Sequence, residues 1–128
     1  MSVHRIDHIT LNSSDLAKTC AFYADGLGFD VQKMEGRGYT GAWLLLDGHP
    51  YVHLVSRSPE QSPETAGLLD HFALEATGLS ETRERLKRAG VNFRENPVPE
   101  FDIHQIVVRD PDGVKVELNF RGAAAREV

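Results

Sequence analysis

The stretch DHITL, residues 7–11, returns in the second half of the chain as DHFAL, residues 70–74. Its surroundings return with it. Each copy is followed by apolar residues at helical spacing, and later by two strands that flank an Asp-Gly turn, at 47–48 and within DPDG at 110–113. A chance match of five residues would not carry this context along, so the sequence predicts a duplicated unit.

In the first half, apolar spacing and glycines predict the element order βαβββ. A helix is expected over residues 13–29, capped by Ser13 or Ser14 and ended by two glycines. Cys20 falls on its apolar face, where a buried thiol is expected rather than a nucleophile. The strands are expected over residues 3–11, 30–35, 41–46 and 51–56.

The second half predicts the same order. Its helix is expected over residues 80–90, with Ser80 as the cap. Strands are expected over 70–76, from 91–94 onward, and in a hairpin over 104–120 whose DPDG turn suits type I. Two ion pairs with a spacing of four residues are expected along the helix, namely Glu81 with Arg85 and Glu84 with Arg88.

The two halves together predict an α+β fold in which paired βαβββ modules form a curved mixed sheet. One domain is expected over residues 1–128, as a module 3–57 and a module 68–121. A polar segment with two prolines falls between them, so residues 58–67 are expected to be a linker. Residues 122–128 are expected to be a tail.

Composition excludes several classes of function. The hydrophobic fraction of 41% and charged fraction of 26% are those of an ordinary globular domain. A net charge of −5 argues against a nucleic-acid or membrane partner, and no apolar run reaches the length of a membrane span. A lone cysteine, with no secretory signal pattern, predicts a cytoplasmic protein.

The repeat pairs four residues that could carry chemistry. His8 and His71 hold equivalent places in the first strand of each half, and His53 is the counterpart of Glu117. Alone, each histidine is more often structural than a ligand, and a lone Glu117 is more often solvated on an outer strand face. Because related modules usually pack about a two-fold axis, we expect these four side chains to converge. His4, His49 and His104 have no repeat partner and are expected to be structural.

Imidazoles combined with one carboxylate favour particular metals. This donor set suits Fe(II), Mn(II), Zn(II), Ni(II) or Co(II), and it suits Ca²⁺ and Mg²⁺ poorly. The sequence therefore predicts one divalent transition metal per site, held by His8, His53, His71 and Glu117.

Three stretches resemble the vicinal oxygen chelate superfamily, which includes glyoxalases, epimerases, extradiol dioxygenases and bleomycin-binding proteins. They are DHITLNSSDLAKTCAFYADGLGF (7–29), DHFALEA (70–76) and RDPDGVKVELNF (109–120). The resemblance implies that His8, His71 and Glu117 match the recurrent His-His-Glu ligands and that His53 occupies a fourth ligand position. It also implies a homodimer in which each site is shared between two chains.

The resemblance leaves three functions open. If His53 binds the metal, two open coordination places suit a substrate with two adjacent oxygens, and lyase or isomerase proton transfer by Glu117, with or without His53, is favoured. If His53 is instead a base, Fe(II) dioxygenase chemistry is possible. A metal-free small-molecule binding protein is the third function. Candidates for contacting the substrate are Thr10, Tyr39, Trp43, Tyr51, Phe101 and Gln105.

Overall fold

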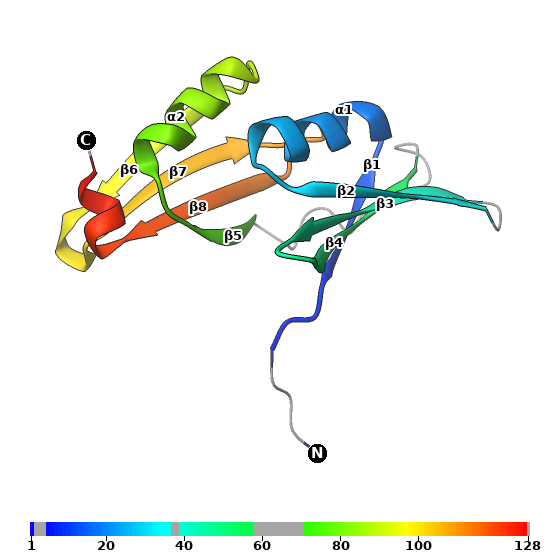
Figure 1. Ribbon diagram of the computed structural model, residues 1–128, viewed down its shortest axis with the longest axis horizontal. Helices are drawn as coiled ribbons and strands as arrows, with labels where there is room; N and C mark the ends of the chain where they lie inside the picture. Colours follow the sequence, from blue (N-terminus) through cyan, green and yellow to red (C-terminus); the bar gives the residue numbers. More distant parts are fainter. Residues whose placement is uncertain (2–4, 37–38, 58–70, 128) are drawn as a thin grey trace.

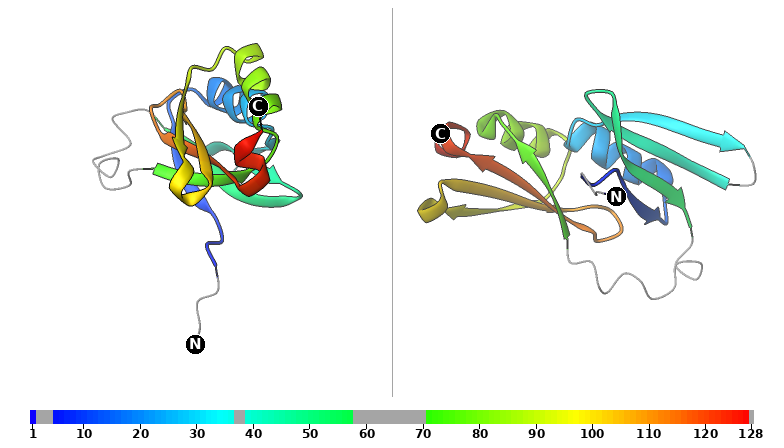
Figure 2. Two further views of the ribbon diagram at one scale, coloured as in Figure 1. Left: turned by 90° about the vertical axis from the view of Figure 1, so that its left-hand side faces the viewer. Right: turned by 90° about the horizontal axis from the view of Figure 1, so that it is seen from below.

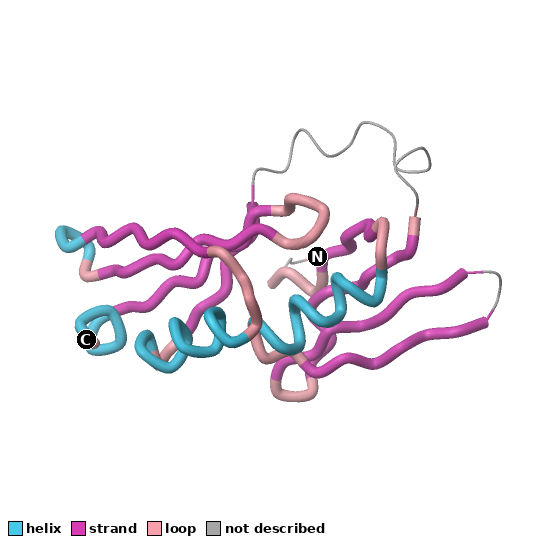
Figure 3. Tube along the Cα trace, turned by 90° about the horizontal axis from the view of Figure 1, so that it is seen from above, coloured by secondary structure: helices cyan, strands magenta, loops and turns pink. Residues whose placement is uncertain are grey.

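The structure is a computed structural model that describes residues 1, 5–36, 39–57 and 71–127 (Figure 1). The expected linker 58–67, His4 and Asp70 lie outside these residues. Two four-stranded sheets lie side by side, and helices α1 and α2 follow one another along the same side of both (Figures 1 and 3). This arrangement confirms the α+β fold of two repeated modules.

The first sheet has the strand order β1-β4-β3-β2, with β1 parallel to β4 and the other pairs antiparallel. The turn between β3 and β4 is the expected Asp-Gly hairpin, and Asp47 and Gly48 both have positive φ, at 49° and 78°. Strand β1 begins later than expected, since pairing with β4 starts at Ile9. The four strands are β1 Ile9–Ser13, β2 Asp30–Gly36, β3 Tyr39–Leu46 and β4 His49–Ser56.

The second sheet repeats this order as β5-β8-β7-β6, again with one parallel pair, β5 and β8. The DPDG turn joins β7 to β8, and the N–H of Gly113 donates to the carbonyl of Asp110 at 2.9 Å, as in a type I turn. A short 3-10 turn at Pro99–Phe101 links β6 to β7. The four strands are β5 His71–Ala76, β6 Phe93–Val98, β7 Ile103–Arg109 and β8 Lys115–Arg121.

The first helix differs from the sequence expectation at its start. Helix α1 spans Leu16–Ala21 and continues as a π-helical turn, η1, at Phe22–Gly26. Its cap is Asp15, whose carboxylate accepts the N–H of Lys18 at 3.2 Å, so the expected Ser13 or Ser14 cap was wrong. Ser13 ends β1 instead, and its buried hydroxyl lies 2.7 Å from that of Thr19.

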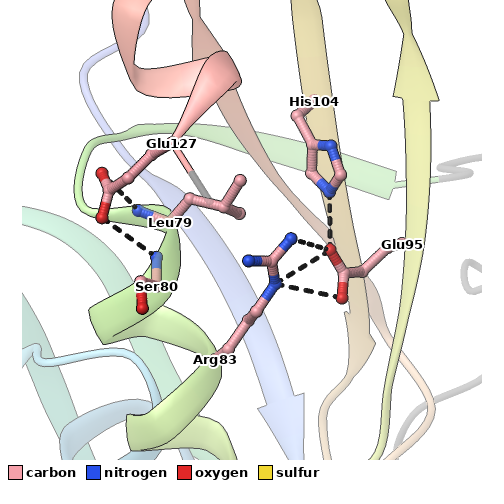
Figure 4. Close-up of polar contacts among 6 residues, drawn as sticks. All are labelled: Leu79, Ser80, Arg83, Glu95, His104 and Glu127. Atoms are coloured by element: carbon pink, nitrogen blue, oxygen red, sulfur yellow. Dashed lines mark hydrogen bonds and ion pairs between the residues drawn. The ribbon is translucent and has the colours of Figure 1, made fainter.

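The second helix, α2, spans Leu79–Arg88 and is capped from the far end of the chain. The Glu127 carboxylate accepts the N–H groups of Leu79 at 3.2 Å and Ser80 at 3.3 Å, so Ser80 is not the cap (Figure 4). Residues expected to be a tail therefore fold back, as a 3-10 helix, η5, at Gly122–Arg126. The helix surface also departs from expectation, because Arg85 donates to the carbonyl of Asp25 at 3.2 Å rather than pairing with Glu81.

One apolar core runs through both modules. A buried polar contact crosses it: the Tyr23 hydroxyl of η1 donates to the Asp110 carboxylate of the β7–β8 turn at 2.9 Å. The other Asp110 oxygen accepts the N–H groups of Asp112 and Val114, each at 2.9 Å. Burial raises the pKa of both the Tyr23 phenol and the Asp110 carboxyl. The modules are thus joined through their helices and this turn.

Replacing Tyr23 with Phe tests how much the Tyr23–Asp110 hydrogen bond stabilises the packing of the two modules. The variant leaves a buried carboxylate without one of its donors, so the free energy of unfolding should fall by about 1–3 kcal/mol. Urea denaturation measures the loss. Tyr51→Phe is the matched control, because Tyr51 is 43% exposed and its loss of a hydroxyl should change stability by less than about 0.5 kcal/mol. An equal loss of unfolding free energy in the two variants would mean that the Tyr23–Asp110 contact does not stabilise the packing of the modules.

Within the described residues, no helix is both long and apolar enough to cross a membrane.

Candidate metal centre

Two histidines and the only tryptophan form a cluster on the first sheet. His53 on β4 lies between Thr10 on β1 and Trp43 on β3 in the strand register. The Trp43 ring stacks on His53 with centroids 4.5 Å apart, and the His8 ring meets the Trp43 edge at 5.2 Å. Trp43 therefore fixes the position of the His53 imidazole and lies beside both rings.

His53 has a donor atom without a partner. Its Nε2 is buried and makes no hydrogen bond with any described residue. Burial, and to a lesser extent nearby His8, lowers the pKa of His53, which favours the neutral form of its imidazole. An unpaired buried nitrogen costs free energy, and a neutral imidazole is the form that binds a metal. This observation fits a metal ligand.

His8 lies just before β1 and is oriented by its neighbours. The Asp7 carboxylate contacts His8 Nδ1 at 2.7 Å, and this hydrogen bond lowers the pKa of Asp7. His49 Nε2 lies 3.2 Å from the carbonyl oxygen of Asp7 and so holds the same turn of chain. A carboxylate on one ring nitrogen leaves the other directed outward, as in many metal-binding histidines. The contact of His49 agrees with the structural role that the sequence predicts for it.

The second sheet carries the other two candidate ligands. His71 at the start of β5 places Nε2 3.3 Å from Oε2 of Glu117 on β8. The Glu117 side chain is 14% exposed, so it is largely withdrawn from solvent although it lies on the sheet face opposite the helix. A buried carboxylate needs a positive charge or hydrogen-bond donors. Imidazole and carboxylate here form a second, separate pair.

A chain of side-chain amides supports Glu117. Gln105 on β7 donates through Nε2 to Glu117 Oε1 at 3.3 Å and to Asn119 Oδ1 at 3.0 Å. Its Oε1 accepts a hydrogen bond from Asn96 on β6 at 2.8 Å. Both ends of the Gln105 amide are therefore occupied. The sequence made Gln105 a candidate for binding substrate, whereas the structure places it where it orients Glu117.

A single chain does not bring the four candidate ligands together. Among the described residues, no group of three or more His, Cys, Asp or Glu side chains is placed to hold one metal ion. The first sheet offers His8 with His53, and the second offers His71 with Glu117. The reason lies in the packing, since the modules meet through their helices and the Tyr23–Asp110 contact.

Three of the remaining substrate candidates lie near His53, and Phe101 lies apart from them. Thr10 and Trp43 flank His53, and Tyr51, two residues before His53 on β4, contacts the His49 ring at 4.3 Å. Phe101 lies in the turn between β6 and β7 and is 73% exposed. The side chain of Tyr39 lies outside the described residues.

His104 belongs to a structural cluster on the helix side of the second sheet. Its Nε2 contacts Glu95 on β6 at 2.6 Å, and Arg83 of α2 donates to the same carboxylate at 2.8 Å (Figure 4). The hydrogen bond from Arg83 is the main cause that lowers the pKa of Glu95. The cluster attaches α2 to the sheet, which agrees with the structural role expected for His104.

The fold defines a class of protein built from two βαβββ modules. The family model of the Glyoxalase/Bleomycin resistance protein/Dioxygenase superfamily matches residues 5–118, and the chain belongs to this superfamily. A probable lactoylglutathione lyase from Vibrio cholerae is 29% identical over 126 residues, which cover 92% of this chain and 91% of that protein.

Solved structures share the fold. A glyoxylase/bleomycin resistance protein/dioxygenase domain from Frankia is 23% identical with a TM-score of 0.74, over 92% of this chain and 98% of that one. A mutant of the fosfomycin resistance protein FosX from Listeria monocytogenes, complexed with Mn(II), is 24% identical with a TM-score of 0.71, over 98% and 96% of the two chains.

Proposed function

We propose that the protein is a homodimeric, metal-dependent enzyme whose sites are shared between chains. In each site, His8 and His53 of one chain would join the partner's His71 and the partner's Glu117 around one divalent transition metal. The observation that carries this proposal is the buried Nε2 of His53, which has no hydrogen-bond partner and lies near His8, with no third ligand placed beside them among the described residues.

The sheet edges support a dimer. Strands β1 and β5 both lie at the edge of their sheet, and among the described strands each pairs with one neighbour only (Figure 2). A cavity of about 410 Å³ lies between them, and apolar side chains line it, among them Phe72, Tyr51 and Ile6, which is 77% exposed. Unpaired strand edges beside exposed apolar side chains are typical of an interface. A second copy of the chain would cover both the strand edges and the exposed apolar side chains.

The donor set decides which metals fit. Three imidazole nitrogens and one carboxylate oxygen suit Ni(II), Zn(II), Mn(II), Co(II) or Fe(II). Such a metal, held by these residues, would supply Lewis-acid chemistry to a small substrate with two adjacent oxygens. The Mn(II) bound by the FosX relative agrees with a metal on this fold.

The reaction we propose is proton transfer of the lyase or isomerase type. Glu117, held by Gln105, would accept a proton from the carbon beside a substrate carbonyl and return it to the neighbouring carbon. The similarity to a probable lactoylglutathione lyase supports this class. The buried Cys20 agrees with action in the reducing cytoplasm.

A second candidate is an Fe(II) extradiol-type dioxygenase. It is favoured by the same neutral His53, which could act as a base instead of a ligand and leave three protein ligands. For either reaction, replacing His53 should lower activity, whereas replacing His104 should not.

Metal titration tests the proposal. Trp43 is the only tryptophan and stacks on His53, so Ni²⁺ or Co²⁺ should quench its fluorescence on binding. Metal analysis of tag-free protein should give one ion per chain. Assays for lactoylglutathione lyase activity and for catechol ring cleavage then separate the two candidates. Failure to bind any of Ni²⁺, Mn²⁺, Co²⁺, Zn²⁺ or Fe²⁺ would contradict both and favour a metal-free binding protein.

Gln105→Leu should weaken metal binding without unfolding the protein. The variant removes the donor that orients Glu117, and loss of such a support typically lowers metal affinity by about 10–100-fold. Isothermal titration with Ni²⁺ measures the change. Ile103→Leu, two residues away on the same face of β7, is the control and should bind Ni²⁺ normally. Unchanged affinity in Gln105→Leu would show that Glu117 needs no such support.

A further inference from the structure

A cleft lies between the two modules, outside the proposed metal centre. Its volume is about 800 Å³, within the range of small-molecule sites. Helix α1 and η1 line one side with Lys18 and Phe22, and the ends of β6 and β7 line the other with Phe93, Arg94 and Arg109. None of these residues is a candidate metal ligand.

The cleft is positively charged. Lys18, Arg94 and Arg109 line it, against the single carboxylate of Asp25. This balance is opposite in sign to that of the whole chain, whose net charge is −5. A positive cleft in an acidic protein concentrates anions locally.

The two arginines of the cleft have no carboxylate partner among the described residues. Arg94 is exposed and makes no hydrogen bond or ion pair there, and Arg109 donates only to the carbonyl of Gly113, at 3.0 Å. In contrast, Arg83 is neutralised by Glu95 and Arg126 by Asp102. The guanidinium groups of Arg94 and Arg109 are thus available for a carboxylate or phosphate, which they recognise through paired hydrogen bonds.

The cleft is also apolar between these charges. Phe22, Phe93 and Val107 line it, so a ligand with an aromatic or aliphatic body would bury that surface. Val107 pairs directly with Glu117 in the strand register, so the edge of the cleft lies one strand from β8, at a backbone spacing of about 5 Å.

We propose that this cleft binds an organic anion, with its carboxylate or phosphate group on Arg94 and Arg109 and its apolar body against Phe22 and Phe93. The site needs neither a metal nor a second chain. It goes beyond the proposed function, because it assigns to the protein a charged ligand that the candidate metal ligands do not specify.

Nuclear magnetic resonance of the metal-free protein tests this proposal with matched probes. Benzoate and phenylphosphonate carry the two anionic groups, and benzamide has the shape of benzoate without its charge. We expect the anions to shift the backbone amide signals of Arg94, Val107 and Arg109 with dissociation constants on the order of millimolar. Benzamide should bind at least ~10-fold more weakly. The stronger of the two anions identifies the ligand group.

Variants locate the site. The double variant Arg94→Gln/Arg109→Gln should lose anion binding by ~10-fold or more. Arg121→Gln is the control, because Arg121 is an exposed arginine of the same sheet that does not line the cleft, and it should bind the anions normally. The proposal is overturned if neither anion binds, if benzamide binds as well as benzoate, or if the double variant binds like the unmodified protein. The double variant should bind Ni²⁺ with unchanged affinity. This titration therefore distinguishes a failure of the anion site from a failure of the proposed metal site.

Discussion

Replacing His8 with alanine should abolish stoichiometric metal binding. His8 is one of the two candidate imidazole ligands of the first module, and the Asp7 carboxylate contacts its Nδ1. Loss of a direct ligand should lower affinity for Ni²⁺ by more than the ~10–100-fold that follows loss of an outer partner. Isothermal titration and quenching of Trp43 fluorescence both measure the effect.

His104→Ala is the control for this experiment. His104 lies on the helix side of the second sheet, where it contacts Glu95, and it has no part in either ligand pair (Figure 4). The variant should bind Ni²⁺ like the unmodified protein, even if its stability falls. The reverse pattern, with metal lost in His104→Ala and kept in His8→Ala, would refute the assignment of ligands.

Combining a His8→Ala chain with a Glu117→Ala chain in one dimer should restore one metal site, although neither variant should bind metal alone. His8→Ala damages the first half of a site, and Glu117→Ala damages the second half. If sites are shared between chains, a dimer of one chain of each kind has one site with both changes and one site with neither. A heterodimer isolated with two different affinity tags should therefore bind one Ni²⁺ with normal affinity after the tags are removed.

This experiment distinguishes a shared site from a site within one chain. If each chain held its own metal, both sites of the heterodimer would be damaged and neither would bind with normal affinity. Homodimers of each variant, which should not bind, are the control. Dimer formation itself is checked by analytical ultracentrifugation, and a monomer at all concentrations would contradict the proposed arrangement.

The repeat made most of the fold predictable. The DHxxL pair, the helical spacing after each copy and the two Asp-Gly turns are local signals, and they led to the observed order of strands and helices. Alternation along β8 likewise explains why Glu117 lies on the face opposite the core residues Val116 and Leu118. These predictions succeeded because residues near in sequence determine which face a side chain occupies.

Contacts between distant segments could not be predicted in the same way. The cap of α2 comes from Glu127, and the support of Glu117 comes from Gln105 and Asn96 on other strands. The expected Ser80 cap was wrong because the capping carboxylate, that of Glu127, is distant in the sequence. Ser14 does not cap α1 because its hydroxyl contacts Asp112 of the distant β7–β8 turn, and Ser13 ends β1. Each of these contacts depends on how elements that are distant in the sequence pack together.

The sequence by itself determined that the chain is a duplicated α+β protein and which four residues hold equivalent places in its modules. Only the tertiary structure decided that one chain separates those residues into the pairs His8–His53 and His71–Glu117. The physical reason is that periodicity fixes the face of each strand, whereas the packing of α1, η1 and α2, with the buried Tyr23–Asp110 contact, fixes how the two sheets lie. The repeat therefore predicts equivalent halves, and the packing of the modules places those halves apart.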